Sequence, residues 1–114
     1  MKFIMIVLLA VFLVGIKSIS VKADELSCLA EAVYFEARSD PFIAQLAVAN
    51  VVLARVDSER YPNNVCDVVH QAKKWKGNPI RNKCQFSYWC DGKPENIANV
   101  LAYQEAVSAS ELAL

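Results

Sequence analysis

Four cysteines in a short stretch of chain set the strongest limit on what this sequence can fold into. Cys28, Cys66, Cys84 and Cys90 all lie in the last 91 of 114 residues. An even number of cysteines in so short a segment is typical of exported domains, in which disulfides supplement a small hydrophobic core. Three pairings are open, and the spacing does not choose among them. A zinc site is the alternative, but it favours closer cysteine or histidine pairs than these residues and the single His70 provide.

The amino-terminal residues have the pattern of an export signal. Lys2 supplies a positive start, and residues 3–16 form an apolar stretch of 14 residues. As a helix this stretch would span roughly 21 Å, too short for a hydrocarbon core of about 30 Å. We therefore predict a signal peptide over residues 1–23, cleaved after Ala23, with an uncleaved membrane anchor as the alternative. Either one makes residues 24–114 a secreted or periplasmic domain.

Size and charge argue against a multidomain protein and against a protein that binds nucleic acid. A chain of 12.7 kDa allows one domain. All 12 acidic residues follow residue 23, and the segment 24–114 carries a formal charge of −3. This balance gives no reason to expect nucleic acid as a partner. We expect a monomer that contacts a membrane only through its signal peptide.

Apolar periodicity predicts a mainly helical, α+β domain. Apolar residues recur at three- and four-residue steps from Leu26 to Ala37, which indicates a first helix. Asp40 is a suitable N-cap and Pro41 a suitable first residue for a second helix that continues to Val56. This second helix is apolar nearly all round, which is typical of a buried central helix.

The second half of the chain has weaker signals. Residues 65–71 are expected to form a short helix or an extended piece, and residues 94–114 a third long helix. Residues 72–83, which include Gly77, Asn78 and Pro79, are interpreted as a basic loop. Residues 85–89 favour a short strand, closed by the hairpin-turn dipeptide Asp91-Gly92.

The basic loop admits two interpretations. Lys73, Lys74, Lys76, Arg81 and Lys83 place five positive charges in a segment without acidic residues. These charges and Trp75 would steer the molecule toward an anionic cell wall, and salt would screen that attraction. The alternative is a solvated loop with no such role.

One glutamate occupies an unusual position on the first predicted helix. At 100° per residue, Glu36 lies within about 20° of Leu29 and therefore on the apolar stripe. Glu31 lies about 200° from Leu29, on the opposite face, as a solvated glutamate does. Apolar surroundings raise the pKa of a carboxyl group, and a general acid needs a raised pKa near neutral pH. The alternative is a Glu36 paired with Arg38 or Arg55.

Five blocks of sequence, taken together, resemble the SleB-type cell wall hydrolase family. They are residues 32–41, 45–56, 61–69, 84–87 and 90–92, in the order and spacing of the family. The resemblance implies a lysozyme-like, mainly helical domain over residues 24–114 that cuts peptidoglycan glycan strands. The family's catalytic glutamate falls on Glu36, the residue that the helix geometry had singled out.

The chain also departs from the family pattern. Ser39 and Ala44 stand where the family usually has glycine, Ala54 where it has asparagine, and His70 where tyrosine is common. The family domain normally continues into a segment with a Thr-His-Tyr motif, and the sequence ends at Leu114 without it. The chain is therefore expected to be a truncated gene product, a fragment or a divergent short form of the domain.

A second catalytic carboxylate is hard to identify in the sequence. Asp40 is expected to cap a helix, and Asp91 to form a turn. One glutamate is sufficient when it protonates the glycosidic oxygen between N-acetylmuramic acid and N-acetylglucosamine and then deprotonates the muramic acid 6-hydroxyl. Lytic transglycosylase is therefore the first hypothesis for the activity, and hydrolytic muramidase the second. No cofactor or metal is expected.

One aromatic residue of the first predicted helix and several aromatic and polar residues of the second half of the chain are candidates for a sugar-binding surface. Sugar faces stack on aromatic rings, and polar residues on one strand face would bind N-acetyl groups. The predicted substrate-binding residues are Tyr34, Gln85, Phe86, Ser87 and Trp89. The alternative to an enzyme is a catalytically inactive secreted module that binds peptidoglycan or resembles an inhibitor.

Overall fold

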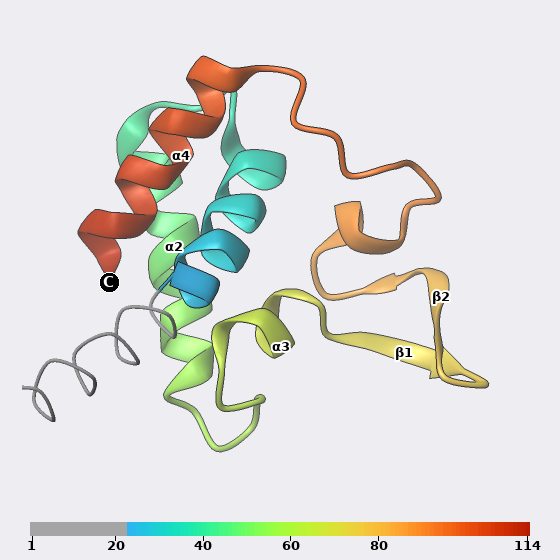
Figure 1. Cartoon of the computed structure of the whole chain (residues 1–114). Coiled ribbons are helices and arrows are strands. Elements are labelled where there is room, and N and C mark those ends of the chain that lie inside the picture. Colours follow the sequence, from blue (N-terminus) through green and yellow to red (C-terminus); the bar gives the residue numbers. More distant parts are fainter. Residues whose placement is uncertain (1–22) are drawn as a thin grey trace, which may run out of the picture.

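A computed structural model describes residues 23–114, and the predicted signal peptide lies outside the described residues apart from Ala23. The first described helix covers residues 23–37. The later elements are α2 (Phe42–Val56), α3 (Val65–Val69), β1 (Ala72–Trp75), β2 (Asn78–Cys84), the 3-10 helix η1 (Ser87–Cys90) and α4 (Val100–Ala113). Figure 1 shows a helical body from which the β1–β2 hairpin projects. The predicted mainly helical, disulfide-stapled fold is confirmed.

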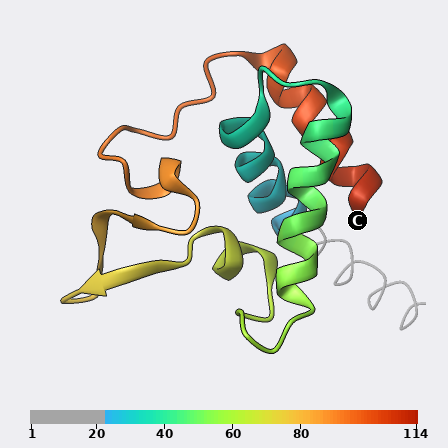
Figure 2. The same ribbon diagram turned by 180° about the vertical axis from the view of Figure 1, so that it is seen from behind.

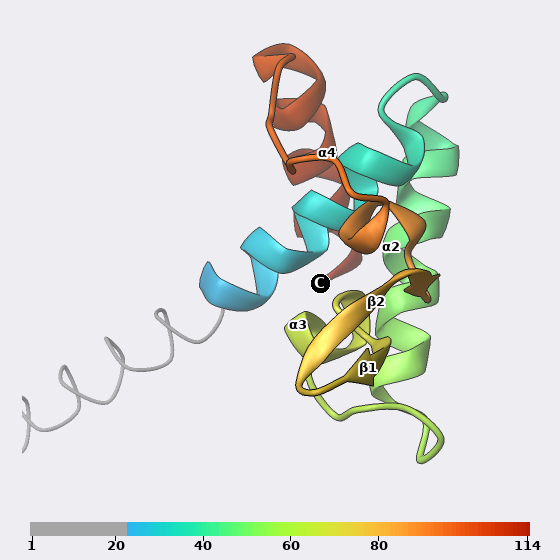
Figure 3. The ribbon, with the colours of Figure 1, turned by 90° about the vertical axis from the view of Figure 1, so that its right-hand side faces the viewer.

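The core lies where the helices meet. Helices α2 and α4 pack against each other, and the 23–37 helix lies beside both of them (Figures 1 and 3). Each helix buries residues at three- or four-residue steps, as its sequence pattern predicts. These fully buried residues are Leu29 and Val33 in the first helix, Ala49 and Val52 in α2, Val65 and Val68 in α3, and Ala106 and Ala109 in α4.

Two predictions about α2 are wrong. The N-cap is Pro41, not Asp40, and no side chain caps the helix. The Pro41 carbonyl already accepts bonds from the amides of Ala44 and Gln45, so Asp40 precedes the cap position. Nor is the helix buried all round, because Ile43 is 72% and Val51 48% exposed. Its neighbours cover only one side, and Figure 2 shows the outer side of α2 facing away from the rest of the body.

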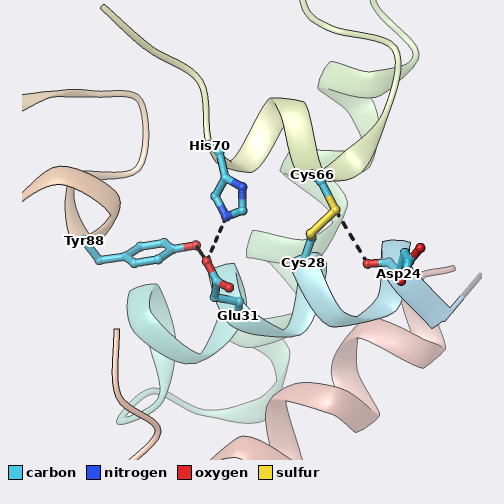
Figure 4. A network of polar contacts seen from close by, with 6 residues as sticks. All are labelled: Asp24, Cys28, Glu31, Cys66, His70 and Tyr88. Atoms are coloured by element: carbon cyan, nitrogen blue, oxygen red, sulfur yellow. Dashed lines mark hydrogen bonds and ion pairs between the residues drawn. A yellow bond between two sulfur atoms is a disulfide. The ribbon is translucent and has the colours of Figure 1, made fainter. Parts of the chain in front are cut away.

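A disulfide and a cap hold α3 against the first helix. Cys28 is bonded to Cys66, which selects one arrangement among the three that the sequence left open. The Asn64 side chain caps α3 by accepting a 2.9 Å hydrogen bond from the amide of Asp67. Figure 4 shows this disulfide beside Asp24, whose carbonyl lies 3.6 Å from the Cys66 sulfur. The predicted short helix in this region is confirmed.

The predicted basic loop is an antiparallel hairpin. Trp75 pairs with Asn78 in the register, so Lys76 and Gly77 form a two-residue turn. Both turn residues have positive φ, 50° and 82°, as this kind of tight hairpin turn requires. Asparagine or aspartate usually precedes the glycine in such a turn, and Lys-Gly lacks that signal.

The predicted strand over residues 85–89 is replaced by η1. The second disulfide, Cys84–Cys90, joins residues only six apart and requires a compact turn between them. The prediction that Asp91-Gly92 forms a hairpin turn is therefore wrong, because no strand flanks it, although Asp91 does accept a local 2.8 Å bond from the amide of Lys93. The predicted third helix begins at Val100 rather than Pro94, because the Asn99 side chain caps the amide of Ala102.

Candidate active site

A cleft of about 480 Å³ lies between the carboxyl end of the first helix and the chain that leads into α4. The first helix contributes Tyr34, Phe35, Glu36 and Arg38. The opposite wall comes from η1 and from the irregular segment over residues 91–99. Its residues include Ser87, Tyr88, Asp91, Lys93, Glu95 and Asn99. Most of the surface that lines the cleft is therefore polar, and it carries charged groups of both signs.

Glu36 lies on the boundary between this polar cleft and an apolar hollow. The hollow, of about 220 Å³, is lined by Glu36, Ala47, Val48, Val51 and Phe86. The exposed outer side of α2 thus forms one of its walls. The same carboxylate therefore faces polar groups on one side and hydrocarbon on the other.

The surroundings of Glu36 favour its protonated form. Partial burial raises the pKa of this carboxyl group above its ordinary value, as the sequence predicts. Within residues 23–114 no basic side chain forms an ion pair with it. Arg38 instead lies over the Tyr34 ring, 5.2 Å from its centroid, and Arg55 lies over Phe86 at 5.5 Å. The alternative of an arginine-paired Glu36 is therefore wrong.

The interpretation of Glu31 as a solvated glutamate is wrong. Its side chain is only 27% exposed, and its Oε1 accepts a 2.8 Å hydrogen bond from the Tyr88 hydroxyl. The same oxygen lies 3.0 Å from Nε2 of His70 (Figure 4). On the face that carries Glu31, the first helix also contacts η1 and the end of α3. Helical periodicity alone does not reveal these neighbours. Burial and the bond to Glu31 both raise the pKa of Tyr88.

The contacts of Glu31 with His70 and Tyr88 support the part of the cleft that Tyr88 and Phe35 line. Tyr88 is buried, and its ring stacks on Phe35 with centroids 4.6 Å apart. The His70 ring stacks on Trp89 at 3.6 Å. Glu31, His70 and Tyr88 thus attach η1 to the first helix next to Glu36. The sequence did not indicate these contacts, because they join three separate segments.

Two further carboxylates line the cleft. Asp91 was considered in the sequence, whereas Glu95 was not, because it lies in a segment without periodicity. Both face the cleft that contains Glu36. Asp40, the other candidate from the sequence, is exposed and does not line the cleft. Loops next to a cleft commonly carry functional residues, which is the signal that could have identified Glu95.

The structure separates the five predicted substrate-binding residues. Ser87 lines the polar cleft and Phe86 the apolar hollow. Tyr34 also borders the cleft, but it is only 1% exposed and its hydroxyl accepts a bond from the Asn99 amide. Its role in substrate binding stays a prediction, and so buried a ring leaves little surface for stacking on a sugar. Gln85 and Trp89 line neither cavity.

The described residues contain neither a cluster suited to a metal ion nor a membrane-spanning helix. Residues 23–114 contain no group of three or more His, Cys, Asp or Glu side chains placed to hold a metal ion. In the same part of the chain, no helix combines the length and the apolar character that a membrane crossing requires.

The fold and the cleft define a small, disulfide-stapled, mainly helical domain with a carboxylate at the edge of a polar groove. The sequence model of the family described as Cell Wall Hydrolase matches residues 39–114. The chain belongs to this cell wall hydrolase family. The match begins three residues after Glu36, so it does not itself include that residue.

Curated relatives agree with this assignment. The chain is 42% identical over 48 residues to a spore cortex-lytic enzyme of Halalkalibacterium halodurans, which covers 42% of this chain and 14% of the relative. It is 40% identical over 50 residues to a spore cortex-lytic enzyme of Bacillus cereus, covering 44% of this chain and 19% of the relative. A Bacillus subtilis enzyme of the same name is 42% identical over 48 residues, 16% of its length. The chain therefore spans less than a fifth of these relatives. No solved structure matches it significantly.

Proposed function

We propose that this domain degrades peptidoglycan by cleaving the glycan strand between N-acetylmuramic acid and N-acetylglucosamine. The observation that carries the proposal is Glu36, which has a raised pKa at the edge of a 480 Å³ polar cleft. Membership of the cell wall hydrolase family and the names of the relatives support the substrate class. The two disulfides support action outside the cytoplasm.

Glu36 supplies both proton transfers in the proposed reaction. Its protonated carboxyl group donates a proton to the glycosidic oxygen as the bond to C1 of muramic acid breaks. The resulting carboxylate then removes the proton of the 6-hydroxyl group, whose oxygen attacks C1. The products are a 1,6-anhydromuramic end and a free N-acetylglucosamine hydroxyl, and Glu36 regains its proton. No water is consumed, which is the reaction of a lytic transglycosylase.

The cleft suits a substrate with polar edges and apolar ring faces. Ser87 and Asn99 provide hydrogen-bonding groups near Glu36, while the hollow beside Phe86 provides an apolar surface. Arg38 and Lys93 place positive charge in the same cleft, and peptidoglycan carries carboxylates on its stem peptides. We therefore propose that Phe86 and Ser87 bind the substrate.

Replacing Glu36 by glutamine tests the proposal directly. The substitution preserves size and removes the proton, so we expect release of soluble fragments from purified sacculi to fall about 10²- to 10⁴-fold. The circular dichroism spectrum should be unchanged. In the wild type, the rate should fall as pH rises through the raised pKa of Glu36, because only the protonated group can act first. An unchanged rate in Glu36→Gln would contradict the proposal.

Product analysis separates the two mechanisms. Mass spectrometry should show 1,6-anhydromuramic ends in the wild-type digest. Reducing ends that have gained water would indicate a hydrolytic muramidase, which requires a second carboxylate. In that case Glu95→Gln and Asp91→Asn should each be tested, because these residues share the cleft with Glu36. Binding to sacculi without fragment release would favour the inactive binding module.

A further inference from the structure

The hairpin over residues 72–84, called the basic hairpin below, contains five of the nine basic residues of the segment 23–114. It carries five basic residues and no acidic one, while the rest of the segment 23–114 has four basic and 12 acidic residues. The formal charge is thus +5 on the basic hairpin and −8 on the remainder. This separation follows the fold, because the hairpin projects from the body (Figure 1).

The tip of the basic hairpin also exposes apolar surface. Trp75 is 70% exposed and Ile80 38% exposed, and together with Pro79 they line a shallow open hollow. The Lys76 ammonium group lies 5.9 Å from the centre of the Trp75 ring. An exposed tryptophan next to an isoleucine costs free energy in water and commonly marks a contact surface.

The base of the basic hairpin is linked to η1, and η1 is hydrogen-bonded to the first helix through Tyr88 and Glu31. Cys84, the last residue of β2, is bonded to Cys90 in η1. The Gln85 amide donates a 3.0 Å bond to the Gln71 carbonyl where the two strands join the domain. A two-stranded hairpin without a packed face is marginally stable by itself, so these links hold an otherwise unsupported tip in place.

We propose that the basic hairpin binds the surface of an anionic phospholipid membrane. Lysine and arginine side chains near anionic lipids gain favourable electrostatic energy, and tryptophan prefers the interface between headgroups and hydrocarbon. The tip supplies both chemistries within a few residues. A soluble polyanion would use the charges and leave Trp75 and Ile80 in water, so the lipid surface fits the observations better. The negative remainder of the domain is repelled, which leaves the hairpin as the docking element.

This membrane contact would be additional to any contact made by the signal peptide. It also does not depend on the activity of Glu36, which lies in a separate cleft. The apolar residues 3–16 remain in every full-length variant and have their own affinity for lipid. The measurement must therefore report on the hairpin itself.

Quenching of Trp75 by lipid gives such a local measurement. The chain has two tryptophans, so the full-length Trp89→Phe variant leaves Trp75 as the single emitter while preserving an aromatic ring against His70. Vesicles of 70% brominated phosphatidylcholine and 30% phosphatidylglycerol quench a tryptophan that enters the acyl region. We expect strong quenching with these vesicles at low salt, weaker quenching at high salt, and little quenching with brominated phosphatidylcholine alone.

Charge variants in the same background test the role of the lysines. Lys73→Gln combined with Lys74→Gln should raise the lipid concentration for half-maximal quenching about 25-fold, since each lysine near the surface contributes about fivefold. Arg60→Gln combined with Lys93→Gln makes the same change in net charge outside the hairpin and should alter it less than about twofold. Equal effects of the two pairs would overturn the proposal.

Two other outcomes would also overturn it. Quenching that is the same with neutral and anionic vesicles would assign any contact to the apolar amino-terminal residues. Binding to a soluble glycerol-phosphate polymer, without quenching by either kind of vesicle, would assign the basic hairpin to a cell wall polyanion instead.

Discussion

The two parts of this domain are stabilised in different ways. The helical body, residues 23–69 and 100–114, buries a continuous set of small apolar side chains between its helices. The arm, residues 72–99, contributes only Phe86 and Tyr88 to the buried core and is held by a short disulfide and a few hydrogen bonds. The body therefore provides the free energy of folding, whereas the arm carries one wall of the cleft and most of the positive charge.

The largest difference between the two parts should be seen when each disulfide is removed. Cys28–Cys66 closes 38 residues within the body, and Cys84–Cys90 closes six in the arm. Chain entropy then predicts a loss of about 4 kcal/mol for the double variant Cys28→Ser, Cys66→Ser and about 2 kcal/mol for Cys84→Ser, Cys90→Ser. The first loss is a large part of the stability of a domain this small.

Urea denaturation of both double variants measures these losses. The first variant should be largely unfolded at 37 °C, whereas the second should keep its helical circular dichroism signal. Similar losses in the two variants would show that the arm is as important to folding as the body.

A smaller effect is expected where the body and the arm are joined by Glu31. Glu31→Ala leaves the Tyr88 hydroxyl and the His70 ring without their partner, and should cost about 1–3 kcal/mol. Glu59→Ala, on the exposed surface, should cost less than about 0.5 kcal/mol. The free energies of unfolding can be compared by urea titration. A double-mutant cycle with Tyr88→Phe should show coupling between the two residues, and strict additivity would contradict the inferred connection.

The smallest effect is the pH dependence due to Glu36. Its folded-state pKa is raised, so the folded protein retains this proton at pH values where the unfolded chain has lost it. Its contribution to stability is therefore complete below the unfolded pKa of about 4.5 and is lost as pH rises through the folded value. Compared with Glu36→Gln, the wild type should be relatively less stable at pH 7 than at pH 3.5. Thermal melting at both pH values measures this, and a constant difference would contradict the burial of Glu36.

The sequence predicted the body better than the arm for a physical reason. A helix buries one stripe of side chains, and that stripe appears in the sequence as a period of three to four residues, as Leu29 and Val33 show. The sequence did not predict the exposed side of α2, because apolar residues such as Ile43 and Val51 continue around the helix. Composition alone cannot show that one of its sides has no neighbour.

The arm gave weaker signals because its side chains are mostly exposed. In β1 and β2 no residue from 73 to 83 is buried, so no alternating apolar pattern exists to indicate strands. The turn at Lys76-Gly77 also lacks the usual asparagine or aspartate. For the candidate site, Glu36 was identifiable from its place on the apolar stripe, and its raised pKa agrees with that reasoning. Glu31 and Tyr88 were not, because their roles depend on contacts between distant segments, and Glu95 was not, because its segment has no periodicity.

The separation of charge between hairpin and body gives this domain a permanent electric dipole. A charge of +5 near one extremity and −8 over the rest experience opposite forces near a charged surface. The resulting torque turns the molecule before it makes any contact, so that an anionic surface meets the hairpin first. Rotational diffusion then needs to sample fewer orientations, and encounters become productive more often at low ionic strength. The arm that adds least to stability thus determines the orientation in which the whole domain arrives.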